Sequence, residues 1–213
     1  MMENLHIING LYAITPDQKN LSILSSQVES CIKGGAKLIQ YRSKKLSKIV
    51  QKKQAKQIKI VCNSYNIPLI INDDIELCRN LDADGVHLGE NDDSLLKARK
   101  LLGPSKIIGI SCYNSIDRVK MAIDGGASYV ALGACFPTKT KPNAPQVTID
   151  LIKFVLKRFN IPLVAIGGID NENVELLVKE GVKCVALINA LFSAKDIEKK
   201  AKVFTNILKK NYE

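Results

Sequence analysis

Short apolar runs alternate along this chain with longer stretches in which apolar residues recur at a helical period, such as VELLVKEG from Val174 and SLLKARKLLG from Ser94. Strands that alternate with helices of about 10 to 15 residues signal parallel βαβ units, and near-continuous apolar strands imply burial on both faces. The eight apolar runs are LYAI from Leu11, GAKLIQ from Gly35, IPLII from Ile67, DADGVH from Asp82, KIIGIS from Lys106, GASYVA from Gly126, IPLVAIGG from Ile161 and GVKCVA from Gly181.

The junctions between helices and strands repeat one design. At Gly35, Asp82, Gly126 and Gly181 a helix ends at a small or turn residue and an apolar strand follows at once. Glycine fits a helix C-cap because that position requires a left-handed backbone. Eight regular units favour a closed (β/α)8 TIM barrel over an open doubly wound sheet. No linker interrupts them, so we expect one α/β domain over residues 1–213, with a lead-in at 1–9 and a last helix that closes near Asn211.

The composition is typical of a globular protein, with 46% hydrophobic and 24% charged residues. No stretch approaches the ~20 apolar residues that a membrane span requires, and the start lacks a charged region and a cleavage site. We therefore expect a cytoplasmic protein without a membrane partner. The six cysteines form no C-x-x-C pair, which predicts reduced thiols used mainly for packing rather than a zinc site.

A net charge of +10 suggests a polyanionic partner. Aromatic residues for base stacking make up only 5% of the chain, and much of the charge lies on helical faces such as residues 52–59, so we expect no nucleic-acid partner. Phosphorylated small molecules then become the expected substrates. The sequence leaves a homo-oligomer open.

In a barrel of this kind the active site lies at the C-terminal ends of the strands. Gln40, Arg42 and Lys44 share a strand face with Leu38, so an inward Leu38 places all three at the mouth of the barrel. An arginine fork beside a lysine point charge suits a diphosphate. A charged strand end that meets solvent is the alternative interpretation.

Acidic residues follow the third and fourth strands, at Asn72 to Asp74 and at residues 89–93. Carboxylates on adjacent loops can hold Mg²⁺ together with substrate phosphates. The same residues could instead be N-caps for helices that start near Ile75 and Ser94.

Three further stretches could bind an anion. Ser111 follows the fifth strand and could donate to a substrate, although it could equally start a helix. Gly167 and Gly168 could bring backbone N–H groups close to a phosphate, or simply form a tight turn. Residues 133–145 carry two threonines, three prolines and two lysines, a stiff cationic loop that could hold an anion or be a solvated surface loop.

Neither histidine is well placed as a general base, because His87 lies inside the fourth strand and His6 in the lead-in. We expect His87 to be a packed, hydrogen-bonded residue of the core. No Ser/His/Asp or Cys/His arrangement, H-E-x-x-H or Walker loop occurs. The sequence therefore favours chemistry based on cations and anion stabilisation.

Six stretches at the expected strand ends occur in one order: IQYRSK, PLIINDDIELC, ADGVHLGEND, KIIGIS, ALGACFPTKTKPNAP and IPLVAIGGI. With them the chain resembles the thiamine phosphate synthase family of (β/α)8 barrels over nearly its whole length. The resemblance implies a transferase that joins a hydroxymethylpyrimidine diphosphate to a thiazole phosphate and releases pyrophosphate with Mg²⁺.

The resemblance also implies site residues. Arg42, Lys141 and Ser111 would be catalytic, and Asp73 and Asp92 would bind the metal. The pyrimidine diphosphate would contact Gln40, Tyr41, Arg42, Ser43, Lys44, Asn72, Ser111 and Lys141. The thiazole phosphate would contact Thr138, Lys139, Thr140, Gly168, Ile188 and Asn189.

The chain departs from the family pattern at a few positions. Asn189 stands where serine is usual, Tyr41 where leucine is common, and Cys112-Tyr113 where a polar pair is frequent. A related thiazole tautomerase uses a histidine just after the serine of strand five, where this chain has Cys112 and Tyr113. That tautomerase and a non-catalytic nucleic-acid-binding barrel are the alternative functions.

Overall fold

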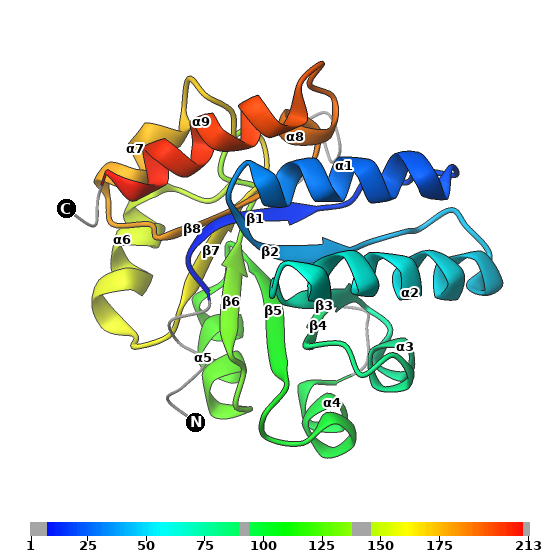
Figure 1. Ribbon diagram of the computed structural model, residues 1–213. Coiled ribbons are helices and arrows are strands. Elements are labelled where there is room, and N and C mark those ends of the chain that lie inside the picture. Colours follow the sequence, from blue (N-terminus) through cyan, green and yellow to red (C-terminus); the bar gives the residue numbers. More distant parts are fainter. Residues whose placement is uncertain (1–7, 90–93, 138–145, 211–213) are drawn as a thin grey trace.

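The computed structural model describes residues 8–89, 94–137 and 146–210, and Figure 1 shows strands at its centre with helices around them. The strands are β1 Gly10–Ile14, β2 Ala36–Tyr41, β3 Leu69–Asn72, β4 Gly85–Leu88, β5 Ile107–Tyr113, β6 Tyr129–Leu132, β7 Leu163–Ile166 and β8 Cys184–Leu187. The helices are α1 Leu21–Lys33, α2 Lys48–Ser64, α3 Ile75–Asn80, α4 Leu95–Leu102, α5 Ile116–Asp124, α6 Ile149–Arg158, α7 Val174–Lys179, α8 Asn189–Phe192 and α9 Ile197–Lys209.

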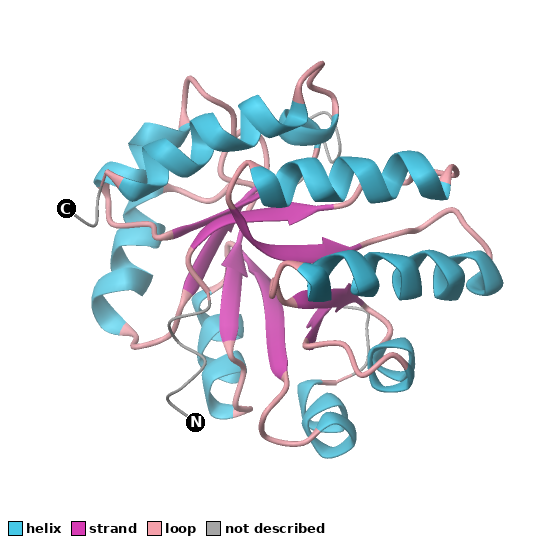
Figure 2. Ribbon diagram, viewed as in Figure 1, coloured by secondary structure: helices cyan, strands magenta, loops and turns pink. Residues whose placement is uncertain are grey.

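The eight strands are all parallel and form a closed barrel in the order β1 to β8, with β8 paired to β1. Figure 2 shows that the helices form the outer layer. The predicted (β/α)8 barrel is therefore confirmed. One detail differs: β8 is followed by the four-residue helix α8 before the long helix α9, so the last unit has an additional helix.

The last helix closes the outer layer against the first. Helices α9 and α1 lie side by side (Figure 1), and the Thr205 hydroxyl donates to the Gly34 carbonyl at 2.9 Å. Within the described part of the chain, no helix has both the length and the apolar character needed to cross a bilayer.

The predicted junctions are confirmed in their backbone geometry. Gly35, Gly126 and Gly181 have φ values of 98°, 78° and 91°, and Asp82 has a φ of 49°. All four therefore lie in the left-handed region, which lets each helix end turn directly into the next strand.

Strand alternation creates two apolar regions. Tyr12 and Ile14 of β1 point into the barrel, whereas Leu11 and Ala13 point toward the helices. The strands are apolar on both faces because both faces are covered. All six cysteines are free and buried in these regions, as predicted for packing residues.

Tyr129 fills the barrel interior and depends on the glycine opposite it. Gly109 on β5 pairs in register with Tyr129 on β6, and a Cβ at Gly109 would collide with the Tyr129 ring and its hydroxyl. The Tyr129 side chain is fully buried. Gly109 therefore supplies the space that this tyrosine occupies.

We expect Gly109→Ala to destabilise the protein by roughly 1–3 kcal/mol, because overpacking a filled core forces side chains and backbone to shift. The measurement is the urea midpoint of unfolding. The double variant Gly109→Ala with Tyr129→Leu should lose less stability than the sum of the two single variants. Additive losses would show that the contact is not the cause.

Candidate functional site

A cavity of about 660 Å³ opens at the C-terminal ends of β2 and β3. Its wall includes side chains from both strand ends and from the starts of α2 and α3. The lining residues that matter here are Tyr41, Ser43, Lys44, Asn72, Asp73 and Asp74. All except Asp74 belong to the predicted site.

Asp17, in the loop after β1, organises the loop after β2. Its Oδ1 accepts hydrogen bonds from the backbone N–H of Lys44 at 2.7 Å, from that of Lys45 at 3.1 Å and from the Ser43 hydroxyl at 3.1 Å. Its Oδ2 lies 4.0 Å from Nη1 of Arg42. One carboxylate thus fixes the loop that carries three of the predicted anion-binding side chains.

The pKa of Asp17 reflects this role. Burial by itself would raise the pKa, but the hydrogen bonds from Lys44, Lys45 and Ser43 and the charge of Arg42 outweigh it and lower the pKa below 3.8. Because the folded-state pKa is lowered, the contribution of these bonds to stability is complete above 3.8 and is lost as the pH falls through the lowered value.

Two buried polar residues complete the support of this loop. Thr15 has no exposed surface; its hydroxyl donates to the Arg42 carbonyl at 3.1 Å and accepts from the Arg42 N–H at 2.8 Å. The Tyr41 side chain packs between barrel and helices, and its hydroxyl donates to Gln54 of α2 at 3.0 Å. Tyr41 therefore lines the cavity wall, but its hydroxyl is directed to α2.

The two neighbouring aspartates after β3 have different tasks. Asp74 is the N-cap of α3, accepting from the Leu77 N–H at 2.8 Å. Asp73 has a φ of 65° and does not cap the helix; its carboxylate pairs with the Lys44 ammonium across the cavity. The capping interpretation is thus confirmed for Asp74, whereas the Asp73 carboxylate lines the cavity without capping the helix.

Inside the barrel, five side chains form what we call the interior hydrogen-bond chain. Nε2 of Gln40 donates to the Tyr12 hydroxyl at 2.8 Å, and the Tyr12 and Tyr129 hydroxyls are 3.0 Å apart. Nδ1 of His87 lies 2.9 Å from the Tyr129 hydroxyl, and Nε2 of His87 lies 2.9 Å from Oγ of Ser111. The chain joins Gln40 on β2 to Ser111 on β5 across the barrel.

The packing of these rings supports the hydrogen bonds. The His87 and Tyr129 rings stack with centroids 5.5 Å apart, and the Tyr12 ring meets Tyr129 edge-on at 6.1 Å. Gln40 is 2% exposed and His87 9%. The prediction that His87 is a packed, hydrogen-bonded residue is confirmed.

Ser111 belongs to β5 and not to a helix start. Ser115 is the residue that caps α5, with its hydroxyl accepting from the Arg118 N–H at 3.3 Å. Nε of Arg118 donates to the Ser111 carbonyl at 3.2 Å, and its guanidinium lies 5.3 Å from the centre of the Tyr113 ring. Arg118 is thus a further cation next to Ser111.

On the far side of the rim, Gly167 and Gly168 have φ values of 95° and 68°. A Cβ at Gly168 would collide with the carbonyl oxygens of Phe136 and Pro137. The glycines therefore allow the loops after β6 and β7 to approach closely, and their phosphate role stays a prediction. Ile188 and Asn189 lie directly after β8, where α8 begins.

The structure brings together the predicted residues on β2, β3 and β5. Arg42, Ser43 and Lys44 share the Asp17 anchor, Lys44 meets Asp73, and Gln40 connects to Ser111. Asn72 pairs in register with His87 on β4. The remaining predicted residues lie outside the described part of the chain: Asp92, Thr138, Lys139, Thr140 and Lys141.

Sequence reasoning missed the supporting residues Tyr12, Thr15, Asp17 and Tyr129. Tyr12 alternates with Ile14 on an apolar strand, and this alternation could have placed it inside the barrel. Nothing local marks Asp17, because its partners lie 26 to 28 residues further along the chain.

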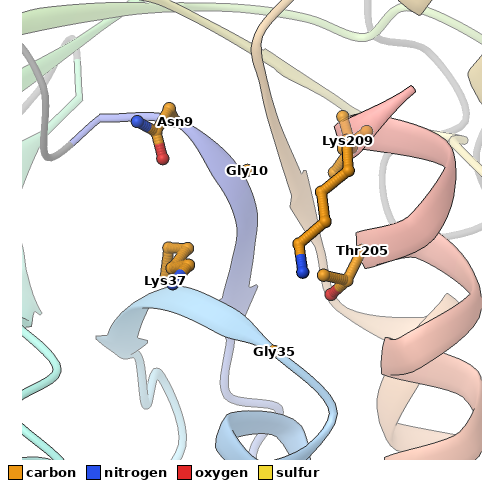
Figure 3. Close-up of a pocket in the computed structure, with 7 residues that line it drawn as sticks. Asn9, Gly10, Gly35, Lys37, Thr205 and Lys209 are labelled. Atoms are coloured by element: carbon orange, nitrogen blue, oxygen red, sulfur yellow. The ribbon is translucent and has the colours of Figure 1, made fainter. Parts of the chain in front are cut away.

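A second cavity lies at the opposite end of the barrel. It measures about 170 Å³ and lies between the starts of β1 and β2 and helix α9, where the Lys209 side chain runs beside Thr205 (Figure 3). Its lining includes Lys37 and Lys209 but none of the predicted site residues. The second cavity therefore lies apart from the C-terminal ends of the strands, where this fold has its active sites.

The comparisons with known proteins agree with this geometry. The model of the family described as thiamine monophosphate synthase matches residues 11–191. A thiamine-phosphate synthase of Methylobacillus flagellatus is 47% identical over 92% of this chain and 94% of its own, and one of Nitrosomonas eutropha is 44% identical over 94% of each. A solved thiamine phosphate pyrophosphorylase from Pyrococcus furiosus is 29% identical, with a TM-score of 0.88 over 98% of this chain and 100% of its own. This chain therefore belongs to the thiamine monophosphate synthase family.

Proposed function

We propose that this transferase joins a hydroxymethylpyrimidine diphosphate to a thiazole phosphate, with release of pyrophosphate. The observation that carries the proposal is the anchored loop after β2, in which Asp17 holds Arg42, Ser43 and Lys44, and the Lys44 ammonium pairs with the carboxylate of Asp73. Fixed cations beside a carboxylate suit a diphosphate that arrives with a divalent ion.

We further propose Mg²⁺ as that ion, held by Asp73 and Asp92 together with substrate oxygens. The donor chemistry fits, because Asp73 offers a hard oxygen ligand at the cavity and is not used as a helix cap. Mg²⁺ is usually bound through one or two carboxylates, with water and substrate phosphate oxygens as its other ligands. When bound, Mg²⁺ would neutralise charge on the diphosphate.

The reaction is a dissociative substitution. The C–O bond to the diphosphate breaks with both electrons leaving on oxygen, and the electron-rich aminopyrimidine stabilises the positive methylene. The thiazole nitrogen then donates its lone pair to form the new C–N bond. Arg42 and Lys141 stabilise the departing charge, Ser111 donates a hydrogen bond, and the barrel mouth positions both reactants.

The described residues give the tautomerase alternative no support. The position after the strand-five serine is Cys112, which is fully buried toward the helices, and burial raises the pKa of its thiol to about 12. A thiol in that state cannot exchange protons with a substrate near neutral pH.

The direct test is incubation of the purified protein with both phosphorylated substrates and Mg²⁺, followed by a pyrophosphate assay. We expect pyrophosphate to form in equal amount to the coupled product, and no pyrophosphate without Mg²⁺. Pyrophosphate release that does not require the thiazole phosphate would contradict a synthase and indicate a hydrolase.

Asp73→Asn should lower kcat by roughly 100-fold or more and raise the Mg²⁺ concentration required for half-maximal rate, because a carboxylate ligand of the ion that neutralises the diphosphate is lost. The matched control is Asp74→Asn. Asparagine caps helices about as well as aspartate, and the exposed Lys48 pair contributes little, so rate and Mg²⁺ dependence should be kept. Equal Mg²⁺ dependence in both variants would remove Asp73 from the metal site.

Asp17→Ala should raise the KM for the pyrimidine diphosphate by roughly tenfold or more, because hydrogen bonds to a charged group contribute about 1.5–3 kcal/mol each to loop order. Asp196→Ala serves as the control: it removes the N-cap of α9, whose carboxylate accepts from the Lys199 N–H at 2.9 Å. The control should lose about 1 kcal/mol of stability with an unchanged KM. Steady-state kinetics and thermal unfolding separate the two effects.

A further inference from the structure

The interior hydrogen-bond chain has a direction, which follows from the orientation of the Gln40 amide together with a count of donors. Each tyrosine hydroxyl has one proton to donate. Nε2 of Gln40 already donates to the Tyr12 oxygen, so the Tyr12 proton goes to the Tyr129 oxygen. The Tyr129 proton then goes to Nδ1 of His87.

The direction continues through the histidine. If Nδ1 of His87 accepts, a neutral ring carries its proton on Nε2, which then donates to Oγ of Ser111. The Ser111 proton is thus not committed to His87 and can be donated toward the mouth of the barrel. At the opposite end, the side-chain carbonyl of Gln40 is not engaged by Tyr12.

The opposite direction would also satisfy every hydrogen bond of the chain, but it would reverse the donor and acceptor roles of Gln40 and Ser111 at the mouth of the barrel. With the Gln40 amide reversed, Tyr12 would donate to Gln40, Tyr129 to Tyr12, and Nδ1 of His87 to Tyr129. Nε2 of His87 would then accept from Ser111, and Ser111 would face the mouth as an acceptor. The hydrogen-bonding character of Gln40 and Ser111 is therefore coupled through three intervening side chains.

The environment of the tyrosines keeps this coupling intact. Both hydroxyls are completely buried, and burial is the main cause that raises the pKa of Tyr12 and of Tyr129 above the ordinary value. Both therefore remain protonated donors near neutral pH. Buried donors nearly always find an acceptor, so neither hydroxyl leaves its bond unmade.

We propose that Tyr12, Tyr129 and His87 are positioning residues that hold His87 in its Nε2–H tautomer and thereby make Ser111 a hydrogen-bond donor to the substrate. The tautomer follows from the orientation of the Gln40 amide, whose Nε2 donates to the Tyr12 hydroxyl at 2.8 Å. The effect on substrate rests on the proposed function, since Gln40 and Ser111 would both contact the pyrimidine diphosphate.

The first test is ¹⁵N NMR of the full chain labelled at histidine, in a His6→Gln background so that His87 is the one histidine left. We expect a pyridine-type resonance for Nδ1 and a pyrrole-type resonance for Nε2. The reverse assignment, or two pyrrole-type resonances, would overturn the proposal without any activity measurement.

The second test interrupts the chain away from the histidine. In Tyr12→Phe, the Tyr129 hydroxyl can either donate to Nδ1 of His87 or accept from it, so a second tautomer should become populated. Tyr41→Phe is the matched control, because it removes a buried hydroxyl that bonds Gln54 on the outer side of the same barrel. Its His87 spectrum should equal that of the parent, and the same spectrum for Tyr12→Phe would refute the coupling.

Kinetics separate this proposal from the proposed function. Tyr12→Phe should lower kcat/KM for the pyrimidine diphosphate roughly five- to tenfold, the loss expected for one misdirected hydrogen bond, with the KM for thiazole phosphate unchanged. An unchanged kcat/KM would refute the positioning role. Absence of turnover in the parent protein, together with the expected tautomer, would refute the proposed reaction and leave the direction of the chain established.

Discussion

Closure of the barrel is the constraint on which the rest depends. Eight parallel strands that close on themselves force alternate side chains into a space without solvent, and that space must be filled and its polar atoms satisfied. Tyr129 can fill this space because Gly109 has no side chain. The buried Tyr129 hydroxyl then requires hydrogen-bond partners, which are Tyr12 and His87. The side chains that fill the barrel therefore also determine the hydrogen bonds of Gln40 and Ser111 at its mouth.

At the rim of the barrel, acidic residues hold the charged side chains of the loop after β2 in fixed positions. Arg42, Ser43 and Lys44 belong to a loop that would be free to move if its backbone N–H groups had only water as partners. Asp17 accepts hydrogen bonds from the Lys44 N–H and the Ser43 hydroxyl, and the Lys44 ammonium pairs with the Asp73 carboxylate. The Asp17 carboxylate thus holds this loop in place in advance, which would lower the entropic cost of binding the proposed diphosphate.

Local rules in the sequence were sufficient for the scaffold. Left-handed turns at Gly35, Asp82, Gly126 and Gly181 and the inward position of Gln40 follow from residue type and strand alternation. The division of labour between Asp73 and Asp74 could not be predicted, since both are good caps. The pairing of Tyr12 with Tyr129 spans 117 residues, and only the closed barrel brings them together.

The cysteines have a consequence for handling the protein. All six are buried, and burial raises the pKa of the thiols, to about 12 for Cys31, Cys62, Cys78 and Cys112 and about 11 for Cys135. Alkylating reagents and dissolved oxygen react with exposed thiolates, which the folded molecule does not present. Purification without reducing agent is therefore compatible with the native state, and modification by iodoacetamide becomes a direct gauge of how much of a sample has unfolded.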